Sequence, residues 1–161
     1  VVLYPMSSAT DFPTKEELKG AVIGTFVYIA LYYGFFIPFQ SFSKFFLYYK
    51  KKREAKEKDS KEKLSFRAVK YYNSRDMMAL TGDRTVGNFG EFAIIFLPMF
   101  WIHAVFVDHT QSLTIALIYT ASRAIYPICF QDARLIFFST VPGYLVLTYL
   151  CFQVGWNVVL A

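Results

Sequence analysis

The sequence predicts an all-α integral membrane protein folded as a four-helix bundle. The chain has 161 residues, of which 55% are hydrophobic, 20% are Phe, Trp or Tyr and only 18% are charged. Soluble domains carry about 25% charged residues, and a disordered chain would lack this apolar content. Four apolar runs, each with at most one formal charge, cover residues 20–43, 85–107, 109–131 and 135–161. These observations predict four membrane-spanning segments in a chain about the size of one domain.

Each apolar run is long enough to cross a bilayer as an α-helix. Such a helix rises 1.5 Å per residue, so about 20 residues cross the roughly 30 Å hydrocarbon core. Within lipid the backbone N–H and C=O groups can hydrogen-bond only to each other, so a spanning segment forms either a helix or part of a closed barrel. Long unbroken apolar runs do not fit the short, alternating strands of a barrel. We therefore expect a single transmembrane domain over residues 1–161. Its expected helices are residues 15–50, 83–108, 110–131 and 135–160, and a basic polar loop is expected at residues 50–75.

A capping box supports the start of the first helix, and the prolines within the four expected helices do not argue against any of them. Thr14 and Glu17 have the spacing of a capping box, in which each side chain accepts a hydrogen bond from the other residue's backbone N–H. Each of the four expected helices also contains a proline, which membrane helices tolerate. These prolines are Pro38, Pro98, Pro127 and Pro142.

Positive charge is concentrated between the first two helices. Residues 44–75 contain 12 of the 17 Lys and Arg residues. The positive-inside rule predicts that this loop faces the cytosol, or the equivalent side of an organelle membrane, and that both termini face the other side. One interpretation of the basic run is attraction to anionic lipid headgroups. The interpretation that we favour is a solvated helical extension with Glu54–Lys58 and Glu57–Lys61 pairs; nucleic acid is not an expected partner.

The second helix carries a polar face inside the membrane. Arg84, Asn88 and Glu91 are spaced i, i+4 and i+7, which places them on one side of a helix. Ionisable residues within a membrane are costly, and each is by default a hypothesis of a functional site. His103 lies on another face, near the far end of the same helix, and we expect it at the membrane interface.

The third helix carries a matching face. Arg123, Tyr126 and Phe130 are spaced i, i+3 and i+7. Arg123 and Glu91 each lie eight residues from the basic end of their helix, which is about 12 Å deep in both cases. We therefore predict a direct or water-bridged pair between them. A buried ion pair that only fixes the register of the helices remains an alternative interpretation.

These two faces resemble the motifs of a known family. The segment Arg84-Thr-Val-Gly-Asn88-Phe-Gly-Glu91 resembles the R-x-x-x-N-x-x-E motif of MAPEG proteins, the membrane-associated proteins in eicosanoid and glutathione metabolism. The Arg123 and Tyr126 pair resembles the third-helix pattern of that family, an Arg followed three residues later by Tyr. The resemblance covers residues 83–144, and the four-helix plan extends it to the whole chain.

The resemblance implies a homotrimer that binds glutathione between neighbouring subunits, in the endoplasmic reticulum or another organelle membrane. It implies a glutathione-dependent transferase or peroxidase that acts on lipophilic electrophiles, with glutathione as co-substrate and no metal. Arg would bind the peptide's carboxylates and Glu its ammonium group. By resemblance, the glutathione-binding residues are Arg84, Asn88, Glu91, Arg123 and Tyr126.

The chain departs from the family at positions that matter for catalysis. Phe130 stands where catalytic members often have a second Tyr. An Arg that opens the fourth helix activates the thiol in such members, and Arg134, the candidate here, comes earlier than expected. Pro98 follows Glu91 by seven residues, where about four is usual. The alternative function is therefore a non-catalytic MAPEG-fold accessory subunit of a larger membrane assembly.

Overall fold

Helices account for all the regular structure in the part of the chain that the computed structural model describes, which is residues 12–58, 64–72 and 76–160. Four spans are long and apolar enough to cross a membrane: Lys19–Glu57, Met77–Phe106, Ser112–Cys129 and Ile136–Val159. The predicted all-α bundle with four membrane-spanning helices is thus confirmed. The elements in order are α1 (Lys19–Leu31), the π-helix η1 (Tyr32–Phe36), α2 (Ile37–Glu57), α3 (Phe66–Tyr72), α4 (Met77–Phe106), α5 (Ser112–Ala124), α6 (Tyr126–Cys129), α7 (Ile136–Val154) and the π-helix η2 (Gly155–Val159).

The predicted capping box forms one turn ahead of α1. The backbone N–H of Thr14 donates to Oε2 of Glu17 at 2.7 Å, and the backbone N–H of Glu17 donates to Oγ1 of Thr14 at 3.4 Å. These reciprocal bonds close the turn that leads into Lys19, where the regular helix begins. Hydrogen bonds from Thr14 lower the pKa of the Glu17 carboxyl, because they stabilise its charged form.

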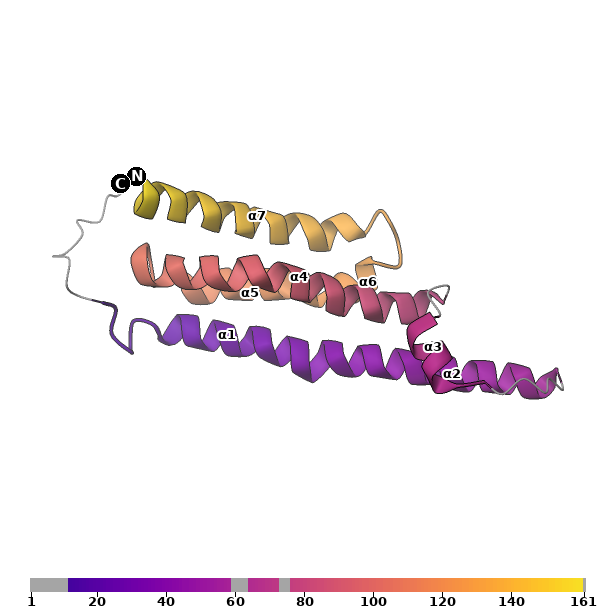
Figure 1. Cartoon of the computed structure of the whole chain (residues 1–161). Coiled ribbons are helices and arrows are strands. Elements are labelled where there is room, and N and C mark those ends of the chain that lie inside the picture. The colour runs from indigo at the N-terminus through magenta and orange to yellow at the C-terminus, as the bar shows by residue number, and fades with distance from the viewer. Residues whose placement is uncertain (1–11, 59–63, 73–75, 161) are drawn as a thin grey trace.

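The first span is longer than predicted. Its 39 residues form one continuous helix with a π-helical turn ahead of Pro38. At 1.5 Å per residue it is about 58 Å long, nearly twice the hydrocarbon thickness. The end of α2 therefore projects beyond the other helices (Figure 1). The helical extension that we favoured for the basic run is thus confirmed as far as Glu57, and the loop expected at residues 50–75 begins only after α2 and contains α3.

Charge pairing along this extension also differs from expectation. Nε of Arg53 lies 3.6 Å from Oε1 of Glu57, an exposed i,i+4 pair. Within the described residues no ion pair joins Glu54 to Lys58, and Lys61 lies outside those residues. An exposed pair of this kind contributes little, about 0.3–0.5 kcal/mol.

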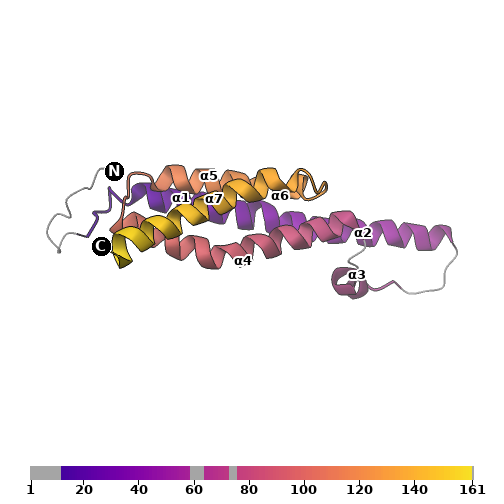
Figure 2. The ribbon, with the colours of Figure 1, turned by 90° about the horizontal axis from the view of Figure 1, so that it is seen from above.

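The helices lie along a common axis. In Figure 1 α4 and α5 lie between the α1–α2 span and α7, and in the view from above α1 and α7 overlap between α5 and α4 (Figure 2). The start of α1, the connection from α4 to α5 and the end of α7 share one end of the bundle. The opposite end carries α3 and the loop from α6 to α7, and it is here called the basic end. Both ends of the described chain therefore lie away from most of the Lys and Arg residues, as the alternation of four spans requires.

Stacked aromatic rings form the core of the bundle. The rings of Phe96 and Tyr119 lie 3.9 Å apart between α4 and α5, and those of Tyr28 and Phe89 lie 4.2 Å apart between α1 and α4. The Tyr28 hydroxyl also donates to the carbonyl oxygen of Phe89 at 3.3 Å. Many other large apolar side chains are exposed on the outside of the bundle, such as Ile94 at 77%. In a bundle of spans this apolar, such an exterior contacts lipid.

His103, which we expected at the membrane interface, lies about one turn from the end of α4 and is enclosed by the bundle. It is fully buried, and its ring lies 5.8 Å from the ring of Tyr149 on α7. In the described part of the chain neither of its ring nitrogens has a hydrogen-bond partner. The burial comes from the packing of this end of α4 against α5 and α7, and the position of His103 relative to the membrane surface stays a prediction.

A short polar turn joins α4 to α5 at the end away from the basic residues. Oδ1 of Asp108 accepts hydrogen bonds from the backbone N–H and the hydroxyl of Thr110, at 2.8 and 2.6 Å. Its Oδ2 accepts from Nε2 of Gln111 at 2.7 Å. Partial burial alone would raise the pKa of Asp108, but these hydrogen bonds together outweigh it and lower the pKa.

Two helix ends set the positions of the polar residues. Asp76 caps α4, because its Oδ1 accepts from the backbone N–H of Ala79 at 3.1 Å. The helix thus begins before Arg84, which lies two turns inside it rather than at its start. The third span breaks at Ile125, between α5 and α6, where Pro127 has no N–H to continue the ladder. The break places Tyr126 at the start of a new short helix.

Candidate functional site: a polar cavity beside a buried arginine

Arg123 is the most constrained charged residue of the bundle. It is 3% exposed at the end of α5, and its guanidinium hydrogen-bonds to groups on α4 and α7. Nη1 donates to Oδ1 of Asn88 at 3.1 Å. Nη2 donates to the carbonyl oxygens of Ser139 at 3.0 Å and Thr140 at 3.4 Å. The side chain therefore ties three helices together at one level.

The guanidinium fits against α7 only because residue 143 has no side chain. A β-carbon at Gly143 would lie 1.8 Å from Nη2 of Arg123 and 2.6 Å from its Cζ. The rings of Phe92 and Tyr119 flank the same group, with their centroids 5.6 and 5.4 Å from Cζ. Aromatic faces attract a cation, and the attraction strengthens where water is excluded. Glycine and the two rings thus make a closely fitting enclosure for the charge.

A polar cavity of about 240 Å³ lies beside this arginine, between α4 and the start of α6. Its lining residues are Asp83, Arg84, Gly87, Asn88, Glu91 and Tyr126. Four of the five predicted binding residues therefore line one cavity, and the fifth, Arg123, reaches it through its hydrogen bond to Asn88. The helical spacing on α4 brings three of these residues together, and the break after Ile125 supplies the tyrosine.

The predicted direct pair of Glu91 and Arg123 does not form. No ion pair joins these two residues, both of which the structure describes, and Arg123 donates to Asn88 instead. Asn88 lies on the same face as Glu91, three residues nearer to the basic end, so its amide oxygen takes the place expected for the carboxylate. Glu91 is exposed at the cavity. The water-bridged form of the pair stays a prediction.

The sequence analysis did not select Asp83, which lines this cavity, or Lys44, which is ion-paired with it. Asp83 accepts an ion-paired hydrogen bond from Nζ of Lys44, and Nε2 of Gln40 donates to its Oδ1 at 2.9 Å. Lys44 is nearly buried in spite of its charge, at 7% side-chain exposure. The available signal was that Lys44 and Asp83 stand at the adjoining ends of two apolar runs, and so at one level.

No protein-family model, curated protein or solved structure matches this chain. The case for function therefore depends on the geometry of its own residues.

Arg134, the predicted thiol-activating residue, is not brought to the cavity. It is exposed in the loop between α6 and α7, where its backbone N–H donates to Oδ1 of Asp132 at 2.8 Å. Its catalytic role stays a prediction. Phe130 stacks on Tyr126 with ring centroids 5.7 Å apart, so the position of the missing second hydroxyl lies next to the tyrosine of the cavity.

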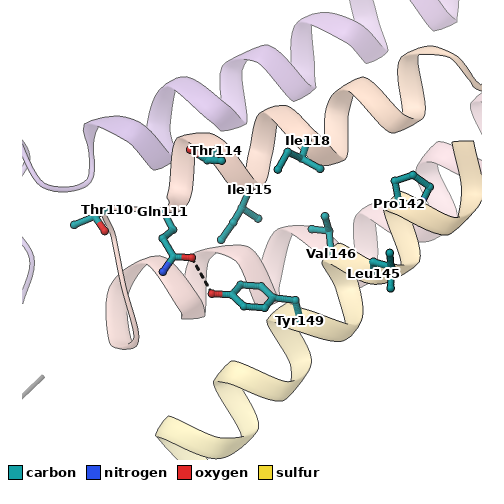
Figure 3. Close-up of a pocket in the computed structure, with 9 residues that line it drawn as sticks. All are labelled: Thr110, Gln111, Thr114, Ile115, Ile118, Pro142, Leu145, Val146 and Tyr149. Atoms are coloured by element: carbon teal, nitrogen blue, oxygen red, sulfur yellow. Dashed lines mark hydrogen bonds between the residues drawn. The ribbon is translucent and has the colours of Figure 1, made fainter. Parts of the chain in front are cut away.

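A larger apolar cavity of about 480 Å³ lies between α5 and α7, toward the end away from the basic residues. Figure 3 shows Ile115, Val146 and Leu145 along its walls, and the hydroxyl of Tyr149 donating to Oε1 of Gln111 at 2.8 Å at one end. Its walls suit a lipophilic molecule. Among the described residues no group of three or more His, Cys, Asp or Glu side chains is placed to hold a metal ion.

Proposed function

We propose that this protein is a MAPEG-like membrane protein that binds glutathione in the polar cavity and uses its thiolate on lipophilic electrophiles. The observation that carries the proposal is the convergence of Arg84, Asn88, Glu91 and Tyr126 on one cavity, with Arg123 hydrogen-bonded behind it. A residue that only fixes helix register needs one partner. Exposed charges of both signs at a cavity supply more recognition groups than that role requires.

The charges at the cavity complement those of glutathione. That peptide carries two carboxylates and one ammonium group, a net charge of −1. The Asp83 charge is offset by Lys44, and the charges of Arg84 and Glu91 cancel. Arg123 therefore leaves one positive charge at the site. The fork of Arg84 suits a carboxylate, and Glu91 suits the ammonium group.

The size of the cavity favours a site shared between subunits. At about 240 Å³ it is below the roughly 300–1,000 Å³ usual for small-molecule sites. Arg84 and Glu91 are both exposed on the protomer, so a neighbouring copy could enclose the ligand further. A homotrimer, as the family resemblance implies, would supply such a neighbour.

The proposed chemistry requires a stabilised thiolate beside the bilayer. Tyr126 lines the cavity, and a hydrogen bond from its hydroxyl would favour the ionised sulfur. In the conjugation reaction the thiol loses its proton, the sulfur forms a bond to the electrophilic carbon of an activated double bond, and a proton is returned to the adjacent carbon. The lipophilic substrate would reach the sulfur from the hydrocarbon, which the exposed apolar exterior contacts.

We also propose that the basic end faces the cytosol, in the endoplasmic reticulum or another organelle membrane. The positive-inside rule supports this orientation. It would open the polar cavity toward the compartment from which a water-soluble peptide can enter.

Ligand-dependent thermal stability tests the proposed function. Glutathione should raise the unfolding temperature of the detergent-solubilised protein, and S-methylglutathione should do so as well if the thiol is not needed for binding. Arg84→Ala should weaken binding by about 10- to 100-fold, because one charge-assisted hydrogen bond is worth about 1.5–3 kcal/mol. Lys51→Ala, on the extension of α2 away from the cavity, is the matched control and should leave binding unchanged.

A second candidate function is that of a non-catalytic accessory subunit. The observation that favours it is the complete engagement of Arg123 inside the protomer, with Asn88 and two carbonyl oxygens of α7. That arrangement stabilises a bundle without any ligand. If glutathione does not raise the unfolding temperature, and Arg84→Ala leaves that temperature unchanged with and without glutathione, this function replaces the first.

A further inference from the structure

A second polar cavity, of about 390 Å³, lies at the basic end between α2, α3 and the start of α4. Lys44 and Lys70 contribute positive charge to its lining, and Phe45 and Phe66 contribute apolar surface. Asp83 lines both this cavity and the polar cavity beside Arg123, so the two cavities are neighbours. The second cavity is called the lysine cavity below.

The buried lysine of this cavity is held in a defined position. Its ammonium group is ion-paired with Asp83, which Gln40 orients through the hydrogen bond to Oδ1. An ammonium group has three N–H donors, and Asp83 accepts from one of them. The side chain of Lys44 is 93% buried, and a buried charge is costly unless it is paired. The ion pair with Asp83 therefore fixes the ammonium group at the cavity.

The second lysine is placed by aromatic packing of α3 on α2. The rings of Phe66 and Phe45 are stacked with centroids 4.9 Å apart, and the ring of Tyr48 meets Phe66 edge-on at 5.5 Å. Val69 is buried against Leu47 in the same contact. This packing holds the short helix across α2 (Figure 1) and sets Lys70 at the lysine cavity.

The lysine cavity lies at the level where hydrocarbon gives way to headgroups. Residues 20–43 carry no formal charge, and Lys44 is the first charged residue after them. Next to it, Phe45 and Phe46 are about half exposed on the outside of α2, at 48% and 59%. Aromatic and basic side chains at the end of an apolar span are typical of the membrane interface. A ligand at this cavity can therefore have its polar part among the lysines and its apolar part in the bilayer.

We propose that the lysine cavity binds the phosphate headgroup of an anionic phospholipid from the leaflet at the basic end. Lys44 and Lys70 place two ammonium groups on the lining, and ammonium groups suit the oxygens of a phosphodiester. The ammonium groups of Lys44 and Lys70 donate to the phosphate oxygens, and Phe45 and Phe66 contact the glycerol and the first carbons of the acyl chains. This site is separate from the glutathione proposal and does not depend on it.

Lipid adducts measured by native mass spectrometry test this proposal. The detergent-solubilised full chain is titrated with dioctanoyl phosphatidylglycerol, with dioctanoyl phosphatidylcholine and with inorganic phosphate. We expect a saturable one-to-one adduct with the anionic lipid, and at least fivefold weaker binding of the other two. Lys70→Gln should weaken the anionic adduct by about fivefold, from the loss of one lysine at the membrane surface. Arg67→Gln, an exposed cation on the same helix but outside the lining, is the control and should change it less than twofold.

Several results would overturn the assignment. Equal losses in the Lys70 and Arg67 variants would mean diffuse attraction to a basic surface, with no site. Equal binding of phosphatidylcholine would remove the role of charge, and equal binding of inorganic phosphate would mean a soluble anion as the ligand. Lys44→Gln removes the buried ammonium group but risks misfolding, so the test depends on Lys70→Gln. Glutathione stabilisation should persist in Lys70→Gln, which keeps the failure of either proposal distinguishable from that of the other.

Discussion

Gly143→Ala tests the enclosure of the buried arginine with the smallest possible change. The added methyl group would lie 1.8 Å from Nη2 of Arg123, so the guanidinium must move away from α7. The movement sacrifices the hydrogen bonds to Asn88 and to the carbonyl oxygen of Ser139, at 3.1 and 3.0 Å. Each hydrogen bond from a charged donor is worth about 1.5–3 kcal/mol. Alanine returns about 1 kcal/mol of helix propensity, so the free energy of unfolding should fall by about 2–5 kcal/mol.

The assay is reversible unfolding of the detergent-solubilised protein with increasing denaturant. Gly90→Ala, in α4, is the control because a β-carbon there would meet nothing within 4 Å, and it should be neutral or slightly stabilising. A double-mutant cycle with Arg123→Gln identifies the cause, since the alanine should cost much less once the guanidinium is gone. Equal stabilities of the Gly143 and Gly90 variants would refute the close packing of Arg123 against α7.

Three further predictions concern charged groups outside that enclosure. Asp83→Asn should lower the free energy of unfolding by about 1–3 kcal/mol, which is less than for a fully buried pair because Asp83 is 43% exposed. Arg53→Gln, which removes an exposed pair, should lower it by under about 1 kcal/mol. Denaturant titration measures both changes. In sealed vesicles, an impermeant amine reagent should modify Lys51 from the cytosolic side, and modification from the other side alone would reverse the proposed topology. The pKa of Asp108 is lower in the folded chain than in the unfolded one, so its carboxylate should stabilise the fold at neutral pH and stop doing so as the pH falls below about 4. The difference in unfolding temperature between the parent and Asp108→Asn should therefore shrink in acid, and a difference that is constant with pH would contradict the assignment.

The polar face of α4 was predictable because it is a property of one helix. Arg84, Asn88 and Glu91 share a face through the 3.6-residue period alone, and they do line one cavity. The partner of Arg123 was not predictable in the same way. Equal depth placed Glu91 within one turn of the right level, but the choice of Asn88 depends on how α4 and α5 are rotated against each other. That rotation follows from ring packing, such as the stack of Phe96 on Tyr119.

Sequence by itself determined the four spans, the basic end and the residues of the polar face, because hydrophobicity, charge and helical period act within single segments. Only the tertiary structure decided what each charge contacts. The buried state of Lys44, the fit of Arg123 against Gly143 and the docking of α3 on α2 all join segments that are distant along the chain. Such contacts depend on shape and rotation at helix interfaces, where a shift of an ångström or two exchanges one partner for another.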